Sequence, residues 1–293
     1  MELKGVIVAA GYGSRFLPVT KTVPKEMLPL IDTPAISFVV DEFLQAEIRD
    51  ILIITSRRKK SLEDFFDREI ELEGVFEREG KETARSAVEP PQARFFFTRQ
   101  QAMKGTGHAL LLARPFTGDH PFVVAYPDDI FLSEKSVSLQ LAHAYADKGC
   151  SVLGVGVRSG PELSRYGVVR PLGDFPHEED LCPVASFVEK PPAATGPSLV
   201  SYGRYLFTPE IYPHLQAGLE NHRQGEYYHV EAINRLAGQG RLFALKLDGS
   251  RLDTGEPAGY LEAICRYALH RPDMEAFAKK LFAELASSNP RRA

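Results

Sequence analysis

A continuous apolar run close to the amino end leads directly into a glycine-containing loop. Leu3–Ala9 is rich in β-branched residues and has the pattern of a strand that is buried on both faces of a sheet. Ala10, Gly11 and Gly13 follow, and glycines let backbone N–H groups approach a bound phosphate closely. We therefore expect an α/β sheet in which this strand ends at a phosphate-binding loop.

Strand-like and helix-like patterns alternate after this loop. Short apolar runs predict further strands, at Asp50–Thr55, Phe95–Thr98, Pro121–Ala125 and Ser151–Val157. Asp32 is expected to cap a helix whose apolar residues, from Ile36 to Leu44, recur at helical spacing. This alternation predicts an α/β fold with a mainly parallel sheet.

Three other segments have a different character. Arg68–Glu89 is rich in charged residues without a clear period, and it predicts a surface excursion with a helical piece. Tyr166–Tyr205 contains short strand-like runs broken by Gly and Pro, as in a β-rich insert. Pro272–Ser287 has the pattern of a solvated amphipathic helix, and residues 289–293 are expected to fray.

Composition narrows the class of protein. The 44% of hydrophobic and 25% of charged residues are typical of a globular protein, and the net charge of −4 argues against nucleic acid as the main partner. No apolar run approaches the roughly 18 residues of a membrane helix, and the amino end lacks a signal-peptide pattern. Cys150, Cys182 and Cys265 lie in no Cys-x-x-Cys or metal-ligand pattern, which predicts reduced thiols. Together these observations predict a soluble cytoplasmic protein that does not associate with membranes.

The glycine loop differs from the two commonest nucleotide-binding fingerprints. Phe16 stands where a dinucleotide-binding loop has its third glycine, and the Gly-Lys-Ser/Thr of a P-loop is missing. In isolation such a loop is most often only a turn after a strand. The cations Arg15 and Lys25 follow it, however, and cations beside a glycine loop suit a triphosphate. The pattern therefore argues against an NAD-binding enzyme and for a nucleoside triphosphate.

The spacing of Gly11, Gly13, Arg15 and Lys25 resembles the signature of the sugar-1-phosphate nucleotidylyltransferases, and Lys25–Pro29 is similar to the bacterial UTP–glucose-1-phosphate uridylyltransferase branch. The resemblance implies that UTP and glucose 1-phosphate give UDP-glucose and pyrophosphate on a Rossmann-like three-layer α/β/α sandwich with a mixed central sheet. Arg15 would contact the β- and γ-phosphates, and Lys25 the α-phosphate. The nucleotide-binding residues of this block would be Ala10, Gly11, Gly13 and Glu26.

A second block resembles the loop that receives the base in this family. Arg99–Ala109 reads Arg-Gln-Gln-Ala-Met-Lys-Gly-Thr-Gly-His-Ala. By the resemblance Gln100 would pair with the uracil edge, since an amide both donates and accepts hydrogen bonds, and Gly105 would allow a close backbone approach. His108 is expected to be a structural helix residue. Without the resemblance, the segment predicts only a helix that starts with small residues.

Two carboxylates are implied as ligands of Mg²⁺. Asp128 follows an expected strand, at the edge where open α/β sheets bind ligands, and carboxylate oxygens suit a Mg²⁺ ion shared with phosphates. By the resemblance Asp128 is one ligand, and Asp253 in a later Asp-Thr-Gly turn completes the site. Asp129 is expected to orient a neighbour, because adjacent residues of an extended chain point in opposite directions. In isolation this Asp pair would be only a turn after a strand.

The sugar end is implied by Phe187–Pro191, which reads Phe-Val-Glu-Lys-Pro and is preceded by a Tyr-Gly-Val-Val run. By the resemblance Glu189 would accept bonds from sugar hydroxyls, Lys190 would neutralise the sugar phosphate, and Gly167 would lie against the sugar ring. Gly203 matches a block near the sugar pocket more loosely. Without the resemblance, an exposed Glu-Lys pair before proline is usually a solvated strand end.

One segment departs from the resemblance. Where the branch typically has Gly-Glu-Ile-Gln-Leu-Thr-Asp-Ala-Ile, residues 225–233 read Gly-Glu-Tyr-Tyr-His-Val-Glu-Ala-Ile. Val230 and Glu231 replace the Thr-Asp pair. If this segment shapes the sugar pocket, the sugar preference stays open, whereas the phosphate chemistry does not. The alternatives are thymidylyl transfer, another sugar 1-phosphate, or a sugar-nucleotide-binding regulatory paralogue without activity.

The matched blocks cover nearly the whole chain and imply its organisation. Residues 1–270 would form the catalytic domain, with a nucleotide-binding part at about 1–150 and a β-rich sugar-binding part at about 151–255. Residues 271–293 would form a C-terminal helical tail. The resemblance also implies a homo-oligomer, either a dimer or a tetramer.

Overall fold

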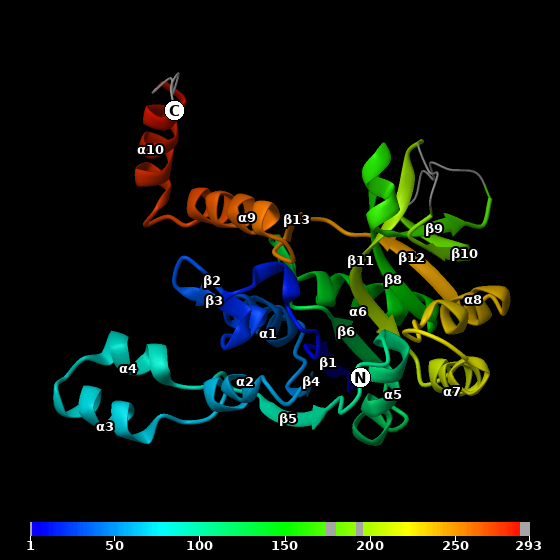
Figure 1. Ribbon diagram of the computed structural model, residues 1–293, viewed down its shortest axis with the longest axis horizontal. Helices are drawn as coiled ribbons and strands as arrows, with labels where there is room; N and C mark the ends of the chain where they lie inside the picture. The colour runs from blue at the N-terminus through cyan, green and yellow to red at the C-terminus, as the bar shows by residue number, and fades with distance from the viewer. Residues whose placement is uncertain (1, 174–179, 192–195, 288–293) are drawn as a thin grey trace.

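Nine strands form one mixed sheet in the computed structural model, which describes residues 2–173, 180–191 and 196–287 (Figure 1). In spatial order they are β5 (Arg94–Arg99), β4 (Asp50–Thr55), β1 (Lys4–Val8), β6 (Phe122–Ala125), β11 (Ser198–Phe207), β8 (Ser151–Arg158), β12 (Leu242–Lys246), β10 (Leu181–Glu189) and β9 (Gly167–Pro171). Two short pairs lie outside this sheet, β2 (Pro29–Leu30) with β3 (Thr33–Pro34), and β7 (Asp129–Leu132) with β13 (Ser250–Asp253).

Strand direction changes in the middle of the sheet. β5, β4, β1 and β6 run parallel, whereas β11 is antiparallel to its three partners, β6, β8 and β9. The carboxyl ends of β1 and β6 therefore lie side by side, at the edge where open α/β sheets bind ligands. The mixed sheet and the strands expected after the glycine loop are confirmed, but the expectation of a mainly parallel sheet is wrong, because β9, β10 and β11 pair antiparallel with their neighbours.

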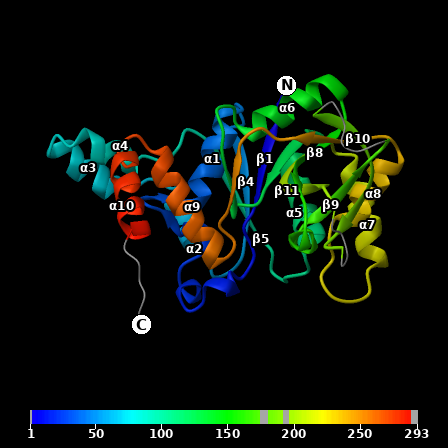
Figure 2. The same cartoon turned by 90° about the horizontal axis from the view of Figure 1, so that it is seen from above.

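Helices cover both faces of the sheet (Figures 1 and 2). On one face lie α1 (Ala35–Gln45) and α6 (Val137–Lys148), and on the other α5 (Thr106–Thr117), α7 (Ile211–Asn221) and α8 (Val230–Gly238). Because side chains alternate along a strand, Ile7 belongs to the core under the first set and Val6 to the core under the second. The expected three-layer α/β/α sandwich is confirmed.

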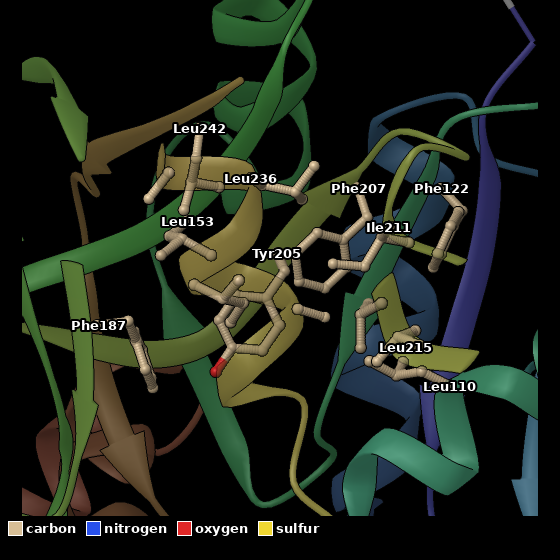
Figure 3. Close-up of a cluster of buried hydrophobic side chains, with 14 of the residues drawn as sticks. Leu110, Phe122, Leu153, Phe187, Tyr205, Phe207, Ile211, Leu215, Leu236 and Leu242 are labelled. Carbon is tan, nitrogen blue, oxygen red and sulfur yellow. The ribbon is translucent and has the colours of Figure 1, made fainter. Parts of the chain in front are cut away.

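The core between the sheet and α7 is rich in aromatic residues, as Figure 3 shows. Phe122 stacks on Tyr212 with ring centroids 5.4 Å apart, and Tyr205 stacks on Phe207 at 5.3 Å. Tyr205 also lines a cavity at the edge of the sheet. The packed core therefore forms one wall of that cavity.

The start of α1 differs from the expectation. Pro34 occupies the N-cap position without a side-chain cap, and the expected cap by Asp32 is wrong. Asp32 instead accepts a hydrogen bond from Arg271, while Thr33 and Pro34 pair with β2. The expected apolar face of the helix is confirmed, since Ile36 and its neighbours one turn on are buried.

Several helices project from the sandwich (Figure 1). The charged excursion contains two helices, α3 (Ile70–Arg78) and α4 (Glu82–Val88), and it follows the short α2 (Lys60–Phe65). The last described elements are α9 (Pro257–His270) and α10 (Glu275–Ser287), so the expected tail helix is confirmed, while residues 289–293 lie outside the described residues. In the described ranges, no helix has both the length and the apolar character needed to cross a membrane.

Candidate active site

Two cavities lie beyond the carboxyl ends of the parallel strands. The first, of about 480 Å³, follows β6 and is called here the β6 cavity. The second, of about 510 Å³, is called the β5 cavity and is lined by residues that follow β1, β4 and β5, among them Tyr12, Arg57 and Gln100. Of the residues expected in the site, those that line the β6 cavity are Arg15, Asp128, Gly167, Glu189, Lys190, Gly203 and Asp253.

The glycine loop after β1 is folded back by local hydrogen bonds. It contains three 3₁₀ turns, η1 (Ser14–Phe16), η2 (Val19–Lys21) and η3 (Lys25–Met27). Thr20 Oγ1 donates a hydrogen bond of 2.7 Å to the carbonyl oxygen of Gly13, which has a φ of 68°. The Arg15 side chain extends from this loop, and its Nη1 donates a hydrogen bond of 3.2 Å to the carbonyl oxygen of Gly255. The amino-terminal loop is thereby joined to the turn after β13.

Lys25 and Asp128 form an ion pair at this junction. Lys25 Nζ lies 2.5 Å from Asp128 Oδ2. Burial by itself lowers the pKa of Lys25, but the carboxylates of Asp128, Glu26 and Asp129 together raise it above its usual value. Burial by itself raises the pKa of Asp128, but Lys25, a backbone hydrogen bond and Arg251 together lower it below its usual value. Both groups are therefore ionised at neutral pH.

The pairing of β7 with β13 brings two carboxylates together. Asp129 lies opposite Asp253 in this pair, and the Thr254 N–H donates to the carbonyl oxygen of Asp128 at 2.8 Å. A Cβ atom built on Gly255 would lie 3.0 Å from Asp128 Oδ2 and 3.1 Å from Asp253 Oδ1. The two carboxylate oxygens therefore border one small space.

This space has the donors that a hard divalent cation prefers. Mg²⁺ binds oxygen, and in proteins it commonly uses one or two carboxylates together with substrate phosphates and water. No group of three or more His, Cys, Asp or Glu side chains in the described part of the chain could hold a metal ion. A cation held by Asp128 and Asp253 would therefore take its remaining ligands from a phosphate and from water.

Arg251 is a site residue that sequence reasoning missed. Its guanidinium pairs with Asp129 Oδ1 and lies 3.5 Å from Asp253 Oδ2, with the rings of Tyr166 and Tyr202 at 5.2 and 5.3 Å from its Cζ atom. Burial alone lowers the pKa of Arg251, but the two carboxylates outweigh burial and raise it. The signal was present in the sequence, because residues two apart in a strand share a face, and Arg251 precedes Asp253 by two.

Lys59 was also missed, and it explains where Glu26 points. Both carboxylate oxygens of Glu26 accept hydrogen bonds from Lys59 Nζ, at 2.6 and 2.7 Å, and this ammonium also donates to the carbonyl oxygen of Ala9. Glu26 is 1% exposed and Lys59 4%. The nucleotide-binding role of Glu26 stays a prediction, and in this geometry its contribution is to hold Lys59 and the end of β1.

The loop before α5, residues 99–105, is held by contacts with α5 and with residues 225–231. Gln100 Nε2 donates to the carbonyl oxygen of Gly105 at 3.0 Å and lies 3.1 Å from His108 Nδ1, which must accept because an amide nitrogen only donates. Gly105 has a φ of 93°, and a Cβ there would lie 2.4 Å from the carbonyl oxygen of Tyr227. The close approach that this glycine permits is therefore made by the 225–231 segment, and His108 positions Gln100.

Lys190 is fixed by its backbone at the other side of the β6 cavity. It adopts a φ of 46°, unusual for a residue with a side chain, and its N–H donates to the carbonyl oxygen of Tyr166 at 3.0 Å. Lys190 Nζ lies 3.7 Å from Glu189 Oε1 in a solvent-accessible position. The ammonium can therefore move toward an anion in the cavity while its backbone stays in place.

Two buried polar groups of the β6 cavity come from the 225–231 segment and from the end of β6. His229 Nδ1 lies 2.8 Å from Thr106 Oγ1. In the described residues, His229 Nε2 and the Tyr126 hydroxyl are buried without a hydrogen-bond partner. Burial lowers the pKa of His229 to about 4, so the imidazole is neutral at neutral pH. Neither residue was singled out from the sequence as a site residue.

The decisive comparison is with a family model described as "Nucleotidyl transferase", which matches residues 4–269. The chain belongs to this nucleotidyl transferase family. A protein of Staphylococcus saprophyticus subsp. saprophyticus named UTP–glucose-1-phosphate uridylyltransferase 2 is 40% identical over 285 residues, which cover 95% of this chain and 97% of that protein. The family resemblance seen in the glycine-loop block is therefore confirmed.

Solved structures of family members agree with the observed fold. The UTP-bound UGPase from Acinetobacter baumannii superposes with a TM-score of 0.87 at 30% identity, over 97% of this chain and 100% of that one. A UDP-glucose pyrophosphorylase complexed with UDP-glucose gives a TM-score of 0.79 at 35% identity, over 92% of this nucleotidyl transferase and 100% of that chain. The sheet that positions the two cavities is thus the fold of the family.

Proposed function

We propose that this nucleotidyl transferase transfers a uridylyl group from UTP to glucose 1-phosphate, giving UDP-glucose and pyrophosphate. The observation that carries the proposal is the group formed by Arg15, Lys25, Asp128 and Asp253 beside the β6 cavity. Two fixed cations and two converging carboxylates suit a triphosphate that is to be cleaved. The names and titles of the similar proteins, which include UTP and UDP-glucose, support the choice of substrates.

The reaction is a direct in-line displacement. An oxygen of the sugar phosphate attacks the α-phosphorus of UTP, and the bond from that phosphorus to the bridging oxygen breaks as pyrophosphate leaves. A phosphate monoester is anionic at neutral pH, so no side-chain nucleophile is required. Catalysis then consists of positioning the reactants and neutralising their charges.

Each charged side chain has an assigned part in this reaction. Arg15 holds the β- and γ-phosphates and the departing pyrophosphate, and Lys25 contacts the α-phosphate during transfer. Lys190 receives the phosphate of the incoming sugar, and Glu189 accepts hydrogen bonds from its hydroxyls. The base would lie in the β5 cavity, which Gln100 lines.

Asp128 and Asp253 would hold Mg²⁺, and bound Mg²⁺ would neutralise charge on the α-phosphate. We expect pyrophosphate release to fall to background in excess chelator and to return when Mg²⁺ is added back. Asp253→Asn should raise the Mg²⁺ concentration that gives half-maximal activity. Asp119→Asn, which removes an exposed carboxylate, is the matched control. Full activity in chelator would contradict the metal requirement.

The organisation of the chain is part of the proposal. Residues 1–270 act as one catalytic unit, with nucleotide-binding and sugar-binding parts at about 1–150 and 151–255, and this is supported by a single sheet that includes strands from both. Residues 271–293 form a tail that contributes to a homo-oligomer. A cytoplasmic location is supported by Cys150, Cys182 and Cys265, which are all free thiols in the described residues.

A substrate panel tests the proposal. Pyrophosphate release is measured with UTP, dTTP, ATP and GTP against glucose 1-phosphate, and then with UTP against other hexose 1-phosphates. UTP with glucose 1-phosphate should give the highest kcat/KM. A preference for dTTP, or for another sugar, would overturn the corresponding part of the assignment. Binding of UDP-glucose without release from any pair would indicate a regulatory paralogue.

A further inference from the structure

Three buried polar atoms of the described residues lack a hydrogen-bond partner and belong to side chains that line the β6 cavity: His229 Nε2, the Tyr126 hydroxyl and Arg251 Nε. The Arg251 guanidinium is already paired with Asp129 and Asp253 through another nitrogen, so the two neutral side chains are the ones left without a polar partner. The Tyr126 hydroxyl lies beside Thr106 but does not form a hydrogen bond of normal geometry with it. His229 is only 7% exposed. Leaving a buried polar group unpaired is unfavourable, so such groups at a cavity wall indicate that a polar atom of a ligand completes them.

The two side chains are held in place around an aromatic surface. The ring of Tyr205 lies 5.4 Å from that of His229 and 6.3 Å from that of Tyr126, edge-on in both cases. Thr106 Oγ1 fixes the imidazole through Nδ1 at 2.8 Å, and the Tyr205 hydroxyl is already paired with Ser201 Oγ at 2.8 Å. The apolar surface of Tyr205 is therefore flanked by two polar atoms that remain available to a ligand.

We propose that His229 Nε2 and the Tyr126 hydroxyl together bind one hydroxyl group of the acceptor sugar and so determine which sugar 1-phosphate is used. The inference rests on the proposed function, because it places the sugar in the β6 cavity. A hydroxyl both donates and accepts, so it satisfies either tautomer of the imidazole and either orientation of the phenol.

The charge state of His229 also suits a hydroxyl. The imidazole is neutral at neutral pH, because burial lowers its pKa to about 4. A neutral imidazole can donate or accept a hydrogen bond but carries no charge, so it matches a neutral hydroxyl group.

His229 lies in the middle of residues 225–233, and its neighbours Tyr228 and Val230 line the same cavity. The backbone of the same segment is fixed against the base loop, since the Gly107 N–H donates to the carbonyl oxygen of Tyr227 at 2.9 Å. A specificity contact from His229 is thus held on a rigid support.

Deoxy sugars test the subsite. At saturating UTP, kcat/KM is measured for glucose 1-phosphate and its 2-, 3-, 4- and 6-deoxy analogues, with the unmodified chain, His229→Leu and Tyr126→Phe. With the unmodified chain, one analogue should have a kcat/KM at least about tenfold lower than that of glucose 1-phosphate. The hydroxyl that this analogue lacks is the one that pairs with both wall atoms, so its loss leaves both of them unpaired. In both variants that penalty should shrink to about threefold or less for the same analogue, and the other penalties should not change. His143→Leu, on the exposed side of α6, is the matched control and should keep the full penalty.

The outcomes separate the subsite from the proposed function. An unchanged pattern of penalties in both variants, or relief at different ring positions in the two, would overturn the subsite while the transferase activity stands. If another hexose 1-phosphate is preferred, the deoxy series is built on that hexose and the same criterion applies. No pyrophosphate release with any sugar 1-phosphate would overturn both. Tyr126→Phe changes only one hydroxyl, so it keeps the test valid if His229→Leu lowers the melting temperature.

Discussion

Lys25 is already neutralised by a protein carboxylate, 2.5 Å away, and it must exchange this partner for a phosphate during the reaction. We expect Lys25→Ala to lower kcat by about 10²–10³-fold, as for other single electrostatic stabilisers, with little change in the fold. Asp128→Asn should act in the same direction. The measurement is pyrophosphate release, with circular dichroism to show that each variant is folded. Lys21→Ala, an exposed lysine of the same loop, is the control, and near-normal kcat in Lys25→Ala would refute the assignment.

Lys59 shows how a single buried charge is maintained beneath the site. In the described residues, the charged group that Lys59 contacts through hydrogen bonds is Glu26, so Lys59→Met would leave a buried carboxylate uncompensated. We expect the free energy of unfolding to fall by about 3–5 kcal/mol, measured by urea denaturation. The double variant Lys59→Met with Glu26→Gln should recover part of this loss, and Lys60→Met, an exposed neighbour, should lose little. A double variant no more stable than the single one would contradict the pairing.

Among the elements, β11 has an irregular hydrogen-bond register where its residues line the β6 cavity. Its register with β8 shifts between Ser201 and Tyr205, and Gly203 within this stretch has a φ of 64°. A Cβ on Gly203 would lie 2.5 Å from Asp129 Oδ2, so a side chain at this position would displace the carboxylate that pairs with Arg251. The irregular strand thereby aligns the sugar side of the cavity with the carboxylates.

Gly203→Ala tests the role of this irregularity. Gly80 is a matched position with a φ of 66° and no neighbour within 4 Å of a built Cβ, so Gly80→Ala should cost only the backbone strain of about 1–2 kcal/mol. Gly203→Ala should lower the free energy of unfolding, measured by urea denaturation, by more than Gly80→Ala does, because the collision with Asp129 adds to the backbone strain. It should also lower kcat/KM, whereas Gly80→Ala should not. Equal effects of the two substitutions would show that the close approach is unimportant.

At the scale of the whole molecule, α10 projects from the sandwich (Figure 1). Two of its apolar side chains are exposed. Phe277 is 60% exposed and Leu285 61%, which is costly for a helix that stays in water. We expect that ending the chain after Arg271 lowers the oligomeric state, measured by light scattering, while kcat stays close to that of the full chain. Phe277→Asp should act in the same direction, and an unchanged mass for both variants would contradict a role of α10 in assembly.

Much of this architecture follows from local patterns in the chain. The strands at Asp50–Thr55 and Ser151–Val157 were predictable because a buried strand needs a continuous apolar run, and that need is local. The start of α1 was not predictable, because the pairing of β2 with β3 keeps Thr33 and Pro34 extended and moves the first helical residue to Ala35. Asp32 therefore lies outside the cap position and pairs with Arg271, a residue 239 positions away.

In the candidate site, too, some residues were predicted from the sequence and others were found only in the structure. The family resemblance brought Arg15, Lys25 and Asp128 into one hypothesis, because their motifs match the family's blocks in spacing and order. The unpaired His229, and the carboxylates that hold Lys59 and Arg251, could be seen only in the folded chain. Burial is a property of the packed molecule, and it is burial that turns an ordinary polar side chain into one that must find a partner.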